Sequence, residues 1–71
     1  MHLERLTQLD ATIRDAVARI ERQRAFVADF NERGYDMRAP LSLLSCLLFN
    51  LRRLEDERRS LAEVLDDVVP V

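Results

Sequence analysis

Apolar residues recur at alternating spacings of three and four along two stretches of this chain, from residue 6 to 30 and from residue 44 to 68. This spacing puts them on one face of an α-helix, and its period is typical of helices that pack side by side as a coiled coil. In heptad notation, the seam positions a and d hold Leu6, Leu9, Ile13, Ala16, Ile20, Gln23, Val27 and Phe30, then Leu44, Leu47, Leu51, Leu54, Arg58, Leu61, Leu65 and Val68. The pattern predicts two long helices, over about residues 3–33 and 37–67, with a short tail at 68–71.

The predicted helices are separated at the only glycine, Gly34. Glycine adopts the left-handed conformation that ends a helix, and Phe30 and Tyr35 then occupy the two positions that meet in a Schellman cap. Asp36 is a suitable N-cap for the second helix. We therefore predict a hairpin turn at Gly34, Tyr35 and Asp36. A link this short makes the helices run antiparallel. In a register centred on the turn, the numbers of two facing residues add up to about 71, so that Ile20 faces Leu51.

The predicted fold is all-α: a single domain, residues 1–71, that forms an antiparallel, coiled-coil-like two-helix hairpin. A chain of this size rarely builds a stable core alone, so we expect the hairpin to complete a four-helix bundle by dimerisation. The second helix supports this, because residues 41–51 are apolar nearly all round.

Apolar residues outside the seam lie on two sides of the hairpin. The e side, named after its heptad position, carries Leu3, Val17, Leu41, Leu48, Ala62 and Val69, and the g side carries Phe26, Leu43 and Val64. Phe49 lies further round the second helix. We expect a homodimer through the e side, with a predicted interface of Leu3, Val17, Leu41, Leu48, Phe49, Ala62 and Val69. A helix of another protein in the same place is the alternative.

Composition limits the classes of partner. The net charge of −2 argues against a nucleic-acid binder. The single cysteine, Cys46, excludes an internal disulfide and favours a reducing compartment. The N-terminus has no secretory apolar region, and the apolar run at 41–51 is far shorter than the roughly 20 residues of a membrane span. We expect a cytoplasmic protein that does not enter a membrane.

Four residues are candidates for chemistry. Gln23 and Arg58 are the polar members of the seam; Gln23 either lines a ligand pocket or fixes the register, and Arg58 either awaits an anion or pairs with Asp10, Asp15 or Glu55. Cys46 is a redox thiol, a dimer cross-link or, as we favour, a packed thiol, and His2 has no second histidine for a metal site.

Arginines are frequent on both helices, at positions 19, 22, 24, 52, 53, 58 and 59. They alternate with Glu21, Asp29, Glu55, Asp56, Glu57 and Glu63, which predicts a solvated face joined by salt bridges. A phosphate-binding stripe needs a net positive field, which this chain lacks.

No phosphate-binding loop, nucleophile elbow, HExxH or CxxC motif is present, so we expect no enzyme activity, cofactor, metal or small-molecule substrate. The favoured function is a small homodimeric adaptor or regulator that binds proteins. The alternative is a subunit or antitoxin-like partner that docks its apolar flank on a larger protein or nucleic-acid complex. A third possibility is a helical enzyme using Gln23 and Arg58, loosely similar to the first helices of chorismate mutases, although their lysine and third helix are missing.

One resemblance covers Ile20 to Leu65. An I-x-R-Q-R motif at residues 20–24 is followed by Gly34-Tyr35-Asp36 and a leucine-rich second helix. In these features the chain resembles short, largely uncharacterised bacterial helical-hairpin proteins with a G-[H/Y]-D turn. Those proteins have a histidine near position 54 and acidic residues near 48–49, where this chain has Leu54, Leu48 and Phe49. The resemblance implies a helical hairpin and no established activity.

Overall fold

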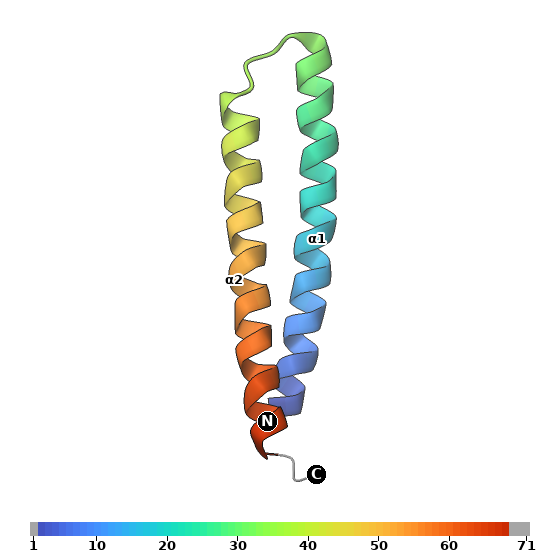
Figure 1. The fold of residues 1–71 in the computed structure, drawn as a ribbon. Coiled ribbons are helices and arrows are strands. Elements are labelled where there is room, and N and C mark those ends of the chain that lie inside the picture. Colours follow the sequence, from blue (N-terminus) through green and yellow to red (C-terminus); the bar gives the residue numbers. More distant parts are fainter. Residues whose placement is uncertain (1, 69–71) are drawn as a thin grey trace.

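Two long helices make up the described part of the chain. The computed structural model describes residues 2–68, with α1 over His2–Arg33 and α2 over Arg38–Val68. The helices run antiparallel and side by side, joined at one end by a short link (Figure 1). The predicted all-α hairpin is confirmed, with helix limits that differ from the predicted ones by one residue. Val69, Pro70 and Val71 of the predicted tail lie outside the described residues.

The hairpin is a thin rod. Its Cα atoms extend over 57 × 17 × 15 Å, so it is only two helices wide. Among the side chains that the structure describes, only Leu9, Ala16, Ile20 and Pro40 are buried. The core is therefore a single line of contacts between the helices.

The seam predicted from the heptads is the surface along which the helices pack. Between Leu6 and Leu65, none of the predicted a and d side chains is exposed. The two helices contribute unequally, because the a and d side chains of α2 from Leu44 to Leu65 are all only half-buried. These half-buried leucines leave apolar surface within reach of a further helix.

The end of α1 has the predicted cap. Gly34 has a φ of +74°, the N–H of Gly34 donates to the carbonyl of Asn31 at 3.2 Å, and the N–H of Tyr35 donates to the carbonyl of Phe30 at 3.0 Å. These two bonds define a Schellman motif. The rings of Phe30 and Tyr35 meet edge to face, with centroids 5.1 Å apart.

The start of α2 is fixed by Asp36. Its carboxylate accepts the backbone N–H of Arg38 at 3.0 Å and also binds the Arg38 guanidinium. The side-chain hydrogen bond from Arg38, followed by the backbone one, lowers the pKa of Asp36 below its usual value. Asp36 thus has the capping role expected of it.

The facing register differs from one centred on the turn. The Gln23 amide donates to the Pro40 carbonyl at 3.0 Å, although the turn-centred register puts Gln23 opposite Leu48. Arg58 pairs with Asp10, although the turn-centred register puts Arg58 opposite Ile13. Side chains tilt toward the N-terminus of their own helix, and in an antiparallel pair this tilt moves each α1 side chain toward higher-numbered α2 residues. The observed α2 partners have lower numbers than expected, so the helices themselves are shifted along each other. The cause is visible in Figure 1, where the link descends along the rod before α2 begins.

Candidate functional site

The hairpin has two flanks on which a partner can pack, and the e side is the one favoured by the sequence. Leu3, Val17, Leu41 and Leu48 are exposed there, and Ala62 is half-buried. Val69 lies outside the described residues. The e side thus has a row of accessible apolar side chains along both helices.

Phe49, the remaining member of the predicted interface, lies apart from this row. It occupies heptad position f of α2, which faces away from the seam, and 66% of it is exposed. An interface centred on the e side reaches Phe49 only at its edge.

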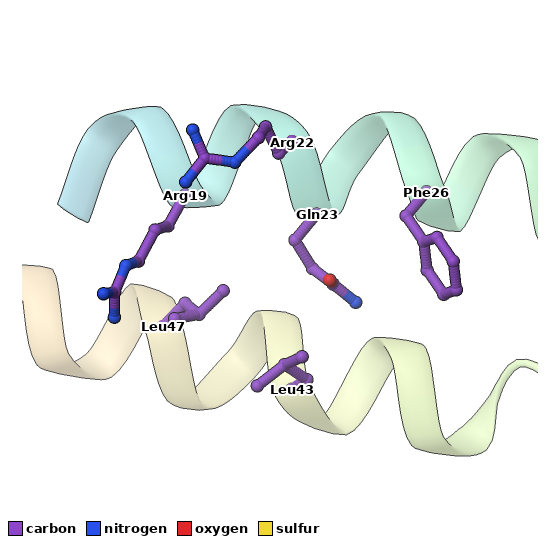
Figure 2. Close-up of a pocket in the computed structure, with 6 residues that line it drawn as sticks. All are labelled: Arg19, Arg22, Gln23, Phe26, Leu43 and Leu47. Carbon is purple, nitrogen blue, oxygen red and sulfur yellow. The ribbon is translucent and has the colours of Figure 1, made fainter. Parts of the chain in front are cut away.

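The g side has a groove that the sequence did not reveal. A hollow of about 420 Å³ lies between the helices, lined by Arg19, Arg22, Gln23, Phe26, Leu43 and Leu47. Figure 2 shows Gln23, Leu43 and Leu47 directed into the space between α1 and α2, and Arg19 extending from α1 towards α2. The floor is apolar apart from Gln23, and of the two arginines Arg22 lies along α1 while the side chain of Arg19 crosses towards α2.

This hollow continues in both directions along the g side. Towards the turn, a second hollow of about 390 Å³ shares Gln23, Phe26 and Leu43 and reaches Phe30 and Pro40. Towards the open end, a third hollow of about 160 Å³ shares Arg19 and Leu47 and reaches Thr12, Asp15, Ala16 and Asn50. We call the three together the g-side groove.

The shifted register explains why this groove was missed. In the turn-centred register Phe26 faces Ser45, a small polar residue that builds no apolar wall. In the structure Phe26 lines a hollow with Ala39, Pro40 and Leu43 instead. The signal available in the sequence was the pair Phe26 and Leu43 at position g.

Charged residues are paired less completely than the sequence predicts. Among the residues that the structure describes, two ion pairs join the helices, Arg58 with Asp10 and Arg5 with Glu57. Others lie within one helix or its cap, such as Arg59 with Asp56. Of the seven arginines expected on a salt-bridged face, five form no ion pair with any residue that the structure describes: Arg19, Arg22, Arg24, Arg52 and Arg53. The predicted salt bridges are therefore wrong for these five, whereas their side chains are exposed, as predicted for a solvated face.

The two polar seam residues both have partners. Gln23 binds the Pro40 carbonyl, which ties the C-terminal half of α1 to the first turn of α2. Arg58 binds Asp10 beside a hollow of about 370 Å³ that also includes Ile13, Glu55 and Ala62. The hydrogen bond and the charge of Asp10 raise the pKa of Arg58. Asp10 is thus the partner of Arg58 among the three candidates.

Other candidate groups are not gathered into a site. Cys46 is an exposed free thiol, so the packed thiol favoured from the sequence is wrong for this hairpin, because position 46 faces away from the seam. Within the described part of the chain, no three His, Cys, Asp or Glu residues are placed to hold a metal ion. Neither helix is long and apolar enough, over its described residues, to cross a membrane.

Comparison with known proteins finds no matching family model, no matching curated protein and no matching solved structure. The resemblance to short bacterial hairpin proteins over Ile20–Leu65 therefore stays a prediction from motifs.

Proposed function

We propose that this protein is a non-enzymatic interaction module, a small adaptor or regulator that forms a homodimer through its e side. The observation that carries the proposal is the imbalance between buried and exposed apolar side chains. Nine large hydrophobic residues are exposed, including Leu41, Leu48 and Phe49, whereas Leu9 is the only large side chain that is fully buried among those described. Exposed apolar surface of this extent is typical of proteins that associate.

The middle of the e side favours a second copy as the partner. Val17 lies at the middle of α1, and the hollow that Ala16 and Arg19 share with Leu47 and Asn50 places Leu48 at the same level of the rod. Val17 and Leu48 have 38% and 39% of their surface exposed. A two-fold axis at mid-length brings each of them near its own copy, which is the self-complementary contact that a symmetric dimer requires. Residues 41–51 of both chains then lie near the centre of a four-helix bundle.

Two further features support a binding role in a reducing compartment such as the cytoplasm. Arg58, the residue that an anionic substrate would need, is already paired with Asp10. Cys46 is an exposed thiol, and the chain has no second cysteine with which to form an internal disulfide. A reducing compartment keeps such a thiol free.

The test is the solution mass by light scattering, with wild type beside Leu48→Glu and Leu43→Glu. Both substitutions put a carboxylate on α2, one on the e side and one on the g side. We expect a wild-type dimer, a monomeric Leu48→Glu protein, and a dimeric Leu43→Glu protein. A carboxylate buried without a partner costs about 3 kcal/mol or more, which weakens dimerisation by more than about a hundredfold.

Two results would contradict the proposal. A wild-type monomer at micromolar concentration would favour the alternative, a subunit that docks its flank on a larger protein or nucleic-acid complex. A dimer that Leu43→Glu dissociates and Leu48→Glu leaves intact would move the self-interface to the g side.

A further inference from the structure

The g-side groove combines an apolar floor with a basic rim. Phe26 and Leu43, on its opposite walls, are 47% and 50% exposed. Arg19 and Arg22 line the same hollow, and neither forms an ion pair with any other residue in the described part of the chain. Across the three hollows, Asp15 is the only carboxylate in the lining, and it lies at the far end from Phe26.

We propose that this groove binds an amphipathic helix of another protein, whose apolar stripe is flanked by Asp or Glu residues. The apolar stripe packs between Phe26 and Leu43, and the acidic residues pair with Arg19 and Arg22. The inference goes beyond self-association, because it uses the side of the hairpin opposite to the proposed dimer interface.

The length and openness of the groove fit a helix. The α1 residues that line it run from Thr12 to Phe30, a distance of about 27 Å at about 1.5 Å per residue. A small ligand is normally enclosed over most of its surface. Here about half of the surface of Phe26 and of Leu43 is exposed to solvent, so the groove is too open to enclose one. A helix laid along two antiparallel helices covers such a strip and contacts it through residues three and four apart.

Charge selects an acidic partner over a second copy. The lining of the groove holds two arginines, Arg19 and Arg22, and one carboxylate, Asp15, so a second copy would bring a lining of the same net positive charge against it. Like charges across an interface oppose association, whereas carboxylates opposite the two guanidinium groups favour it and allow bidentate hydrogen bonds.

The experiment measures binding of two designed helical peptides to the full chain by fluorescence anisotropy. Each peptide spans about three heptads with Leu at a and d, and the flanking e and g positions are all Glu in one peptide and all Lys in the other. We expect wild type to bind the Glu peptide at least tenfold more tightly than the Lys peptide. The variant with both Arg19→Glu and Arg22→Glu should reverse this preference.

The matched control carries Arg14→Glu and Arg52→Glu. These two arginines are also exposed, form no ion pair with any described residue, and line none of the three hollows. The control changes the net charge by the same amount, so it should keep the preference for the Glu peptide. Leu48→Glu should also keep it, because that substitution tests the dimer and leaves the groove unchanged.

Three outcomes would overturn the inference. One is no binding of the Glu peptide, and another is equal binding of both peptides. The third is that the Arg14 and Arg52 control loses the preference for the Glu peptide as fully as the Arg19 and Arg22 variant does. That result would show a general effect of charge. If dodecanoate binds wild type and the Arg19 and Arg22 variant loses it, while neither peptide binds, the groove takes an anionic amphiphile instead of a helix.

Discussion

Gly34 is the residue on which the turn depends most directly. Its φ of +74° lies in the left-handed region, and a Cβ built there meets nothing within 4 Å. An added side chain therefore has room, and its cost is in the backbone conformation alone. We expect Gly34→Ala to lower the free energy of unfolding by about 1 kcal/mol, measured by urea denaturation.

Gly34→Asn is the matched comparison. Asparagine tolerates the left-handed conformation better than alanine, so its cost should be smaller. If alanine and asparagine cost the same, the strain at position 34 is not conformational. If neither has an effect, the turn does not need the Schellman motif.

The features of the turn were predictable from the sequence because their causes are local. Each turn residue acts on residues at most five positions away, as do Phe30, Gly34, Tyr35 and Asp36. Their residue types are the ones that helix caps require. Arg58 differs, since three carboxylates were candidates for it and only the facing register selects Asp10. Local chemistry thus gave the turn, while partners from the other helix had to come from the structure.

The seam and the register of the two helices differ in how far the sequence determines them. Heptads identify which face of each helix is inside, and no a or d residue from Leu6 to Leu65 is exposed. They do not identify which α2 residue lies opposite a given α1 residue, because a slide by one turn keeps the same faces together. The path of the link between Gly34 and Arg38 decides that slide. The g-side groove follows from it, so the sequence could indicate Phe26 and Leu43 at position g but not the hollow between them.

Gln23 is the polar contact that marks this register. We expect Gln23→Glu to lower the free energy of unfolding at neutral pH by about 1–2 kcal/mol. The reason is that a carboxylate cannot donate a hydrogen bond to the carbonyl of Pro40, which is a buried residue. Below about pH 4 the protonated carboxyl can donate, so part of the loss should return. Thermal unfolding followed by circular dichroism at several pH values measures both effects.

Gln8→Glu provides the control for this experiment. Gln8 is an exposed residue of the same helix, so the same substitution there should change stability little at any pH. The comparison separates the hydrogen bond to Pro40 from the general effect of acid on the other carboxylates. Equal behaviour of the two variants would mean that Gln23 does not fix the register.

At the scale of the whole molecule, a rod two helices wide cannot cover its own apolar side chains. Leu41, Leu43 and Leu48 of α2 are all exposed, on two different sides. The sequence identified both sides by heptad position and favoured the e side as the dimer interface. To the g side the structure adds a groove and two arginines without an ion pair to any described residue.

If the hairpin folds as a dimer, its stability must depend on concentration. Because dimerisation stabilises only the folded state, the midpoint of thermal unfolding should rise as the wild-type concentration increases a hundredfold. Leu48→Glu should lower the midpoint and remove this dependence, since it breaks the e-side interface. Gly34→Ala should lower the midpoint and keep the dependence, since it weakens the hairpin without touching that interface. A wild-type midpoint that stays constant over this range would mean that each hairpin is stable alone, and the exposed e side would then have to be assigned to a different protein.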